Sequence, residues 1–545
     1  MRTIHFKADR RGLIVLLLGG LLVRLVIATS LFPGFDEAYY YLYSRHLSWS
    51  YFDHPPLVAL STGVGWWLTG IISPLTIRLG AVFLYLGTLG LFYWTGKRLF
   101  SPAVGQMAVA IATLIPLFTL GFGVLTSPDN SLIFFWTATL ALAVWEFAPQ
   151  SPQHADYRPS WRLALFGLTV GLACLSKYHG FVLGLSLVGF CLTSRPYRRV
   201  FTSPWLALAL LLFGLTLFPL LYWNAQHDWI SFQFQLSMRF DGGEPSRFSL
   251  LQLVGYWLIH IAYLFPAFGF PLWYVTTQQC WWQWQRWWRF PGRTQQPGEA
   301  LGQAAGPSTY ALLLWLSLPI TLGFTLLGGF QQILPAWPAP GFWGLTLLLA
   351  ERAALAQQTR PRLVRRWLWG SGWVLLPLLL LALLHITTGT FQKPGQYSLV
   401  GLMPPSQDAS IELINVQQLR QRIAQSPAIM AALEQSAFVF TNEYYLGGYL
   451  AMAIHPLQAL PITCFSQDPR GFAFWFDQSE WLGQNALYAT LKRFDQQPTI
   501  ANDYRSQFER LDYLGEVALL RGGVEVEWMH FYRASRFKQP YTYPY

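Results

Sequence analysis

Long apolar runs are the feature that most restricts how this chain can fold. Runs of roughly 17 to 25 residues recur through the first 390 positions, the length that an α-helix needs to cross about 30 Å of hydrocarbon. Only 12% of the 545 residues are charged, about half the share of a soluble domain. The sequence therefore predicts a polytopic α-helical membrane protein. We expect about eleven spans, at 12–32, 76–96, 103–122, 130–147, 162–176, 179–193, 204–223, 250–275, 308–328, 333–350 and 367–387.

The distribution of lysine and arginine predicts how these spans are oriented. If the apolar segment 57–72 lies along the outer interface instead of crossing, the loops on the N-terminal side of the membrane hold most of the basic residues. Such loops face the cytoplasm. We therefore expect a multi-pass protein of the plasma membrane with a cytoplasmic N-terminus. The net charge of +11 follows from this topology and implies no nucleic acid partner.

The last part of the chain has a different pattern. After about residue 390 the apolar runs shorten, and a helix-like segment, 410–425, is followed by strand-like segments at 437–441, 459–465 and 472–476. A hairpin at 515–534, turning at Gly522 and Gly523, comes next. These patterns predict a small α/β domain.

The chain thus divides into a transmembrane domain, 1–390, and a domain at 391–545 that an odd number of spans places outside. It would share that side with the first outer loop, 33–75. Residues 276–307 begin with a tryptophan and arginine cluster and are expected to form a cytoplasmic loop at headgroup level. The four cysteines are scattered and predict neither a disulfide nor a metal site.

Polar side chains gather where the predicted spans end on the outer side. Asp36 and Glu37 follow the first span and open a tyrosine-rich segment that suits a short interfacial helix. The same side carries Asp53 and His54 of "YFDHPP", Asp129 of "SPDN", Lys177 and His179 of "SKYHG", His227 of "NAQHDW", and Gln332 before "ILPAWPAP". Singly, each has a structural explanation as a helix cap or interfacial side chain. Because polar groups at membrane depth are costly, together they predict an outward-facing cavity.

These motifs, with the basic N-terminus before the first span, resemble the bacterial protein O-mannosyltransferase-like glycosyltransferases. Those proteins have the GT-C superfold, and their relatives include lipid A aminoarabinose transferase. The similarity covers about residues 1–390, and its first-loop motifs are specific as a set. The resemblance implies a polyprenyl-phosphate-linked sugar as donor, bound from the outer leaflet, and transfer with inversion to a lipid, glycan or protein acceptor.

The resemblance also implies roles for individual residues. Asp36 would be the general base, because an attacking hydroxyl has to lose its proton, and Glu37 would be its partner. Lys177 would contact the donor phosphate and stabilise the leaving group. Substrate contacts are expected from Asp53, His54, Asp129, His179, His227 and Gln332. Many relatives have a basic residue at the place of Gln332, so a phosphate contact does not carry over to it.

Other interpretations of the pattern stay open. A retaining mechanism would need a second carboxylate as nucleophile, which Asp53 or Asp129 could supply. The scheme requires no cofactor; a divalent metal is an open alternative, although no pair of residues shows a convincing ligand spacing. A transporter or flippase of lipid-linked sugars would also have many spans, but it should show interrupted helices near the midplane. A binding or assembly protein would need far fewer spans as an anchor.

Overall fold

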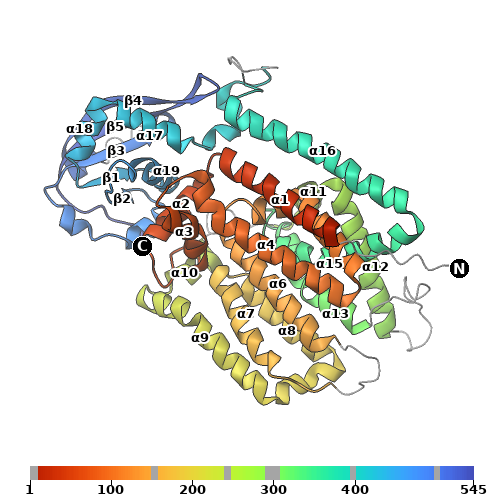
Figure 1. Ribbon diagram of the computed structural model, residues 1–545. Coiled ribbons are helices and arrows are strands. Elements are labelled where there is room, and N and C mark those ends of the chain that lie inside the picture. The colour runs from red at the N-terminus through yellow and green to blue at the C-terminus, as the bar shows by residue number, and fades with distance from the viewer. Residues whose placement is uncertain (1–9, 149–156, 239–246, 289–306, 393–400, 496–503) are drawn as a thin grey trace.

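The computed structural model describes residues 10–148, 157–238, 247–288, 307–392, 401–495 and 504–545, and its membrane half is helical (Figure 1). The helices of the first half are α1 (Arg10–Ser30), α2 (Phe35–Arg45), α3 (Leu57–Thr69), α4 (Pro74–Leu99), α5 (Pro102–Leu114), α6 (Pro128–Phe147), α7 (Arg162–Ser176), α8 (Gly180–Thr193) and α9 (Pro204–Gln226). They are followed by α10 (Ile230–Gln233), α11 (Leu250–Tyr263), α12 (Pro266–Trp288), α13 (Pro307–Trp315), α14 (Leu318–Leu327), α15 (Ala339–Thr359) and α16 (Pro361–Thr388).

In this described part of the chain, six apolar stretches are long enough to cross a membrane. They are α1, α4, α6, α9, α16 and the run Ser308–Leu327 that α13 and α14 share. The pair α11 and α12 would be a seventh, bent by 117°. Shorter apolar helices, α5, α7 and α8, lie within other predicted spans. The predicted class, a helical membrane protein, is confirmed, and the number of eleven spans stays a prediction.

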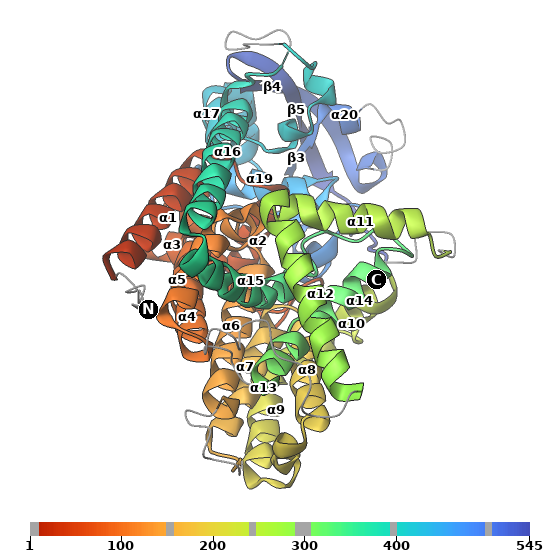
Figure 2. The same ribbon diagram turned by 90° about the vertical axis from the view of Figure 1, so that its right-hand side faces the viewer.

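Proline explains where the helices depart from the predicted spans. Pro266 cannot donate the hydrogen bond that would continue α11, and Phe265 before it adopts a positive φ of 65°. The span predicted at 250–275 is therefore broken at Pro266, and Figure 2 shows α11 crossing the end of α12. The span predicted at 103–122 is likewise interrupted before Pro116, where α5 gives way to a π-helical turn, Leu117–Phe122. Residues 276–288, expected in a loop, continue α12, and 289–306 lie outside the described residues.

The C-terminal part is a five-stranded sheet with helices, as predicted. Its helices are α17 (Val416–Gln425), α18 (Pro427–Glu434), α19 (Tyr444–Ile454) and α20 (Lys492–Asp495). The strands β1 (Phe438–Thr441), β2 (Ile462–Cys464), β3 (Ala486–Leu491), β4 (Phe508–Arg521) and β5 (Val524–Phe537) have the order β2-β1-β3-β5-β4. β1 is parallel to β2 and β3, whereas β3–β5 and β5–β4 are antiparallel.

The predicted hairpin is confirmed, with its turn at Gly522 and Gly523, which have φ values of 57° and 85°. Such positive φ angles are accessible to glycine at little cost. The strand predicted at 472–476 is wrong: Arg470–Phe474 is a 3₁₀ turn, η7, whose Phe472 packs against Tyr39 of α2 instead of joining the sheet. β3 has a continuous apolar pattern that the sequence analysis did not single out.

The C-terminal domain docks on α2 at one end of the helix bundle (Figure 1). Gly448 of α19 packs directly on the backbone of Ala38, where an added Cβ would lie 2.3 Å from the carbonyl carbon. Next to it, the hydroxyl of Tyr449 lies 3.0 Å from the carbonyl oxygen of Pro33. Arg420 donates a 3.0 Å hydrogen bond to the carbonyl of Ile72. One hydrophobic cluster consequently runs from α2 through α19 into the sheet.

This backbone contact gives a test of the docking. Gly448→Val should lower the free energy of unfolding by about 1–3 kcal/mol and expose the C-terminal domain to protease, because the added atoms force α19 away from α2. Gly323→Ala on α14 is the control, since no atom lies within 4 Å of its added Cβ. Thermal unfolding and limited proteolysis in detergent measure both effects, and equal stability of the two variants would contradict this packing.

Candidate active site

A buried ion pair holds the start of α2 against the helix bundle. Arg78 of α4 donates to Glu37 through Nε (2.8 Å) and Nη2 (2.5 Å), and both side chains are almost fully buried. The remaining donors of Arg78 bind the carbonyls of Ala28, Leu31 and Phe32 at the end of α1. The carboxylate of Glu37 also accepts from the backbone nitrogens of Gly34 and Thr126, at 2.9 Å each.

All five guanidinium hydrogens and all four principal acceptor positions of the carboxylate are thereby used. Glu37 was expected to assist Asp36 in catalysis. Its surroundings suit a positioning residue better, since it joins the end of α1, the start of α2, α4 and the segment before α6. Asp36, its neighbour in the chain, is exposed.

Asp36 lies beside tyrosines of both domains. Its charge acts on Tyr40, one turn further along α2, and on Tyr444 and Tyr449 of α19. In each case burial is the main cause that raises the pKa of the phenol, and the charge of Asp36 adds to it. These tyrosines therefore stay protonated and can donate hydrogen bonds at neutral pH. Asp36 is thus an exposed carboxylate close to tyrosines whose phenols are protonated.

Arg470 of η7 brings a cation from the C-terminal domain to the same place. Its guanidinium lies 3.7 Å from the ring centroid of Tyr444, and its Nη1 lies 3.4 Å from Oδ2 of Asp53. Its φ of 48° is in the left-handed region, a conformation that side chains rarely adopt without tertiary support. Burial acts to lower the pKa of Arg470 and the charge of Asp53 acts to raise it; the net direction is upward, so this side chain is charged.

Hydrogen bonds fix the loop of Asp53 between α2 and η7. Tyr43 donates to Oδ1 of Asp53, and the backbone nitrogen of Gly471 donates to the hydroxyl of Tyr39 at 2.8 Å. Gln235 donates to the carbonyl of Asp53 at 2.6 Å. Asp53, at 2% exposure, is thus a buried counter-ion for Arg470 and is not open to solvent.

Lys177 and Asp129, predicted from separate motifs, meet in a bidentate ion pair. Nζ of Lys177 lies 2.9 Å from both carboxylate oxygens of Asp129. Asp129 stands in the first turn of α6, after Pro128, and Lys177 caps the end of α7. The lysine is 7% exposed, so a donor phosphate would reach it only by sharing or replacing this carboxylate.

The three histidines and Gln332 divide between two places. His54 packs edge-on against Tyr40 at 5.7 Å, and His227 stacks on Trp223 at 4.0 Å and faces Phe474 of the C-terminal domain. His179 instead stacks on Phe324 of α14, at 4.8 Å, and its edge meets Trp337. Gln332 is exposed between α14 and α15, and no contact within the described ranges joins it to the carboxylates. The structure therefore separates His179 and Gln332 from His54 and His227.

Metal ligands were the open alternative for these side chains. Among the described residues, no group of three histidine, cysteine, aspartate or glutamate side chains is arranged to hold a metal ion. The carboxylates of Glu37, Asp53 and Asp129 each have a cationic partner from the protein itself. Each of these three carboxylates is therefore paired with an arginine or a lysine of the chain.

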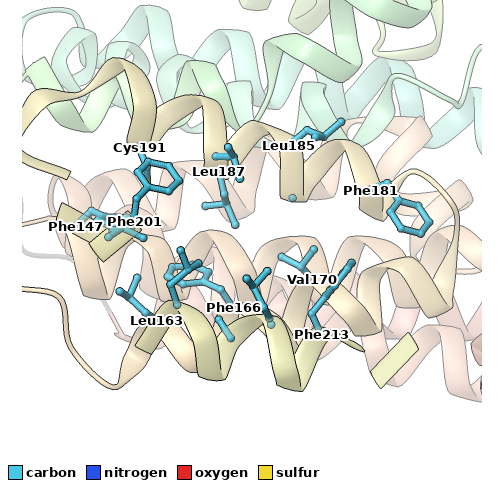
Figure 3. A pocket seen from close by; sticks show the side chains of 17 residues that line it. Phe147, Leu163, Phe166, Val170, Phe181, Leu185, Leu187, Cys191, Phe201 and Phe213 are labelled. Atoms are coloured by element: carbon cyan, nitrogen blue, oxygen red, sulfur yellow. The ribbon is translucent and has the colours of Figure 1, made fainter. Parts of the chain in front are cut away.

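An apolar groove of about 370 Å³ runs between α7, α8 and α9 (Figure 3). Phe166, Val170, Leu187 and Phe213 line its walls, and Gly167 lets α7 approach the backbone of α9 at Ala209. α7 ends at Lys177, so one helix carries both the wall of the groove and the cation. Such a surface suits a hydrocarbon chain.

Comparisons with known proteins agree with this architecture. The family described as dolichyl-phosphate-mannose-protein mannosyltransferase matches residues 53–223. Lipid A galacturonosyltransferase RgtD of Rhizobium johnstonii is 30% identical over 227 residues, which are 41% of this chain and 45% of RgtD. The aligned part thus spans less than half of that curated relative.

Solved structures match over nearly the whole chain. The apo crystal structure of ArnT from Cupriavidus metallidurans aligns with a TM-score of 0.55 at 15% identity, covering 96% of this chain and 98% of ArnT. The protein has the ArnT fold. ArnT from the same organism bound to undecaprenyl phosphate gives a TM-score of 0.54 at 14% identity, covering 98% of this chain and 100% of ArnT. The resemblance to GT-C proteins predicted from the sequence is thereby confirmed.

The ion pair at the start of α2 can be tested by removing one charge. Glu37→Gln should lower the free energy of unfolding by about 3–5 kcal/mol, because Arg78 would be left buried without a counter-ion. Glu351→Gln is the control: Glu351 is also buried but accepts from the neutral hydroxyl of Tyr310, at 2.6 Å. Thermal unfolding compares the two variants, and an equal loss in both would argue against a special role for the Glu37–Arg78 pair.

Proposed function

We propose that this protein is an inverting glycosyltransferase of the bacterial inner membrane. It moves a sugar from a polyprenyl-phosphate-linked donor to a lipid, glycan or protein acceptor at the outer face. The observation that carries this proposal is an exposed carboxylate after the first span, Asp36, whose charge acts on Tyr444, the ring on which Arg470 of the C-terminal domain packs. The ArnT fold and the similarity to RgtD support it.

In this reaction Asp36 is the general base. The acceptor hydroxyl attacks the anomeric carbon from the face opposite the phosphate and transfers its proton to the carboxylate of Asp36. The bond between the anomeric carbon and the phosphate oxygen breaks as the new bond forms, and polyprenyl phosphate leaves with that electron pair. The configuration at the carbon is inverted. Glu37 holds the helix that carries Asp36 and takes no proton.

The developing charge on the phosphate is met by cations of the protein. Lys177 and Arg470 are the candidates, and each is held in place by a carboxylate before the donor arrives, Lys177 by Asp129 and Arg470 by Asp53. Preorganised charges of this kind stabilise a leaving group without reorganising during the reaction. Since two cations of the chain can meet the phosphate, we expect turnover to persist in the presence of EDTA.

The lipid part of the donor accounts for the arrangement around the site. An isoprenoid chain has to stay in hydrocarbon while its sugar phosphate reaches the polar groups at the end of the helices. The groove beside α7 offers an apolar surface along the helix that Lys177 caps (Figure 3). We place these ends of the helices, and with them the C-terminal domain, on the outer side of the membrane.

Asp36→Asn should abolish sugar transfer, with a loss of at least about 100-fold, because an amide cannot accept the proton of the acceptor. The variant should fold and insert normally, since Asp36 is exposed. Mass spectrometry of lipid-linked sugars and envelope glycans, in cells whose gene is deleted and then complemented, shows whether the donor accumulates and the product disappears. Asp477→Asn, which changes an exposed carboxylate on the C-terminal domain, should restore the wild-type pattern. Full complementation by Asp36→Asn would remove this residue from catalysis.

Variants of Lys177 and Asp129 distinguish a lysine that contacts the donor phosphate from an ion pair that only joins α6 to α7. If Lys177 meets the donor phosphate, Lys177→Ala should raise the KM for the donor about tenfold or more, whereas Asp129→Asn should leave it unchanged or lower it, because the lysine is released. If the pair only joins α6 to α7, the two variants should be impaired alike. Donor KM with the reconstituted protein, together with thermal stability, distinguishes the outcomes.

A further inference from the structure

A polar cavity of about 270 Å³ lies between the first outer loop, the end of α9 and η7. His46, Ser48 and Ser50 of the loop, Trp223 of α9, and Phe474 and Trp475 of the C-terminal domain contribute to its walls. The groove beside α7 is lined by apolar side chains. A second groove, between α1, α5 and α16, is also mainly apolar, with two threonines and two tryptophans in its lining. This cavity therefore differs in chemistry from the surfaces that suit hydrocarbon.

The base of the cavity offers a hydrogen-bonding group that the protein itself leaves unused. Ser50 is fully buried, and among the described residues its hydroxyl has no hydrogen-bond partner. A buried polar group without a partner is costly, so a ligand or solvent molecule in the cavity is expected to satisfy it. Ser48 is exposed and provides a second hydroxyl nearer to solvent.

The walls combine aromatic rings with neutral polar groups. Trp475 stacks with His46 at 5.1 Å, and Trp223 meets Phe474 at 5.8 Å. Burial lowers the pKa of His46 to about 4, with the charge of Arg45 adding to this, so the imidazole is neutral at physiological pH and can both donate and accept. The lining residues include no other titratable group except the phenol of Tyr51.

This combination fits one class of ligand. A pyranose ring has an apolar face of C–H groups that packs on aromatic side chains, and hydroxyls at its edge that bind serine and histidine. A cavity of about 150 Å³ holds a benzene ring, so the volume suffices for one sugar ring. A phosphate or carboxylate would find no cation in these walls, and a lipid chain would leave Ser50 unsatisfied.

We propose that this cavity is the subsite for a neutral sugar ring of the acceptor. The inference rests on the proposed transferase function and narrows its acceptor to a glycan or glycolipid. The donor's own sugar is joined directly to its phosphate, so its subsite requires a cation in the wall. The acceptor's sugar has no such requirement. Gly471, which lines the cavity, follows Arg470 in the chain, and Phe52, also in the lining, precedes Asp53; the subsite therefore adjoins the ion pair of Arg470 and Asp53.

Direct binding of simple sugars tests the subsite without knowledge of the natural substrates. The probes are methyl β-galactopyranoside and methyl α-mannopyranoside, observed by saturation-transfer NMR with the full-length protein in nanodiscs; glucose 6-phosphate serves as an anionic comparison. We expect at least one neutral glycoside to receive saturation at its ring protons at millimolar concentration. Absence of transfer to both glycosides, or transfer only to the phosphorylated sugar, would overturn the proposal.

Variants locate the binding in this cavity. Ser50→Leu should fill its base and weaken binding about tenfold or more, because it removes a hydrogen bond and occupies the space. Ser237→Leu, at an exposed serine outside the cavity, is the matched control and should bind as the wild type does. Phe474→Leu keeps an apolar side chain but removes the ring and should also weaken binding; if Ser50→Leu fails to fold, this variant carries the test. Unchanged binding in a folded cavity variant contradicts the assignment.

The test also separates the subsite from the proposed function. Asp36→Asn should bind the glycosides as the wild type does while its transfer is lost. If deletion of the gene leaves the lipid-linked sugars and envelope glycans unchanged, the proposed function fails and the sugar site stands. If deletion changes them but the wild type binds no glycoside, the reverse holds. With the substrates in hand, Ser50→Ala should raise the KM of the acceptor alone, and a rise confined to the donor KM would overturn the assignment to the acceptor.

Discussion

The rest of the structure depends on the buried pair of Glu37 and Arg78. The guanidinium of Arg78 donates hydrogen bonds to the last carbonyls of α1 and to the carboxylate of Glu37 at the start of α2. The same carboxylate accepts a hydrogen bond from the backbone nitrogen of Thr126, before α6. Removing two charges from water is expensive, and the expense is offset only when every hydrogen bond is made, as it is here. The position of α2, and with it that of Asp36, Tyr40 and the docking face for α19, follows from this pair.

Around that fixed helix, the site is assembled from segments that are distant in sequence. The carboxylates come from the first loop and α6, and the cations come from the end of α7 and from η7. Lys177 is paired with Asp129, and Arg470 with Asp53. These groups lie at one end of the helices and not halfway along them. Such an arrangement favours chemistry at an interface, where a lipid head meets water, over passage of a solute through the bundle, which was the transporter alternative.

Sequence alone was sufficient for the features that depend on local pattern. The apolar runs predicted the helical class, and the Gly522-Gly523 turn predicted the hairpin. Asp36, Asp129 and Lys177 each lie at the end of a helix, as their motifs indicated. Features set by distant contacts were missed. The partnership of Arg78 with Glu37 was not foreseen, and Arg470 lies just before the segment predicted as a strand at 472–476, whose Phe472 in fact packs on Tyr39 of α2. No local signal could reveal an ion pair between residues 417 positions apart.

That separation has a consequence for biosynthesis. Asp53 enters the membrane region among the first segments to be translated, yet its counter-ion is added hundreds of residues later. During the interval the tyrosine face of α2 lacks its cover, and the buried carboxylate lacks its neutralising charge. The nascent chain therefore cannot mature stepwise from its N-terminus: the outer loop has to wait, and a product truncated before η7 should remain inert and be recognised by membrane quality control.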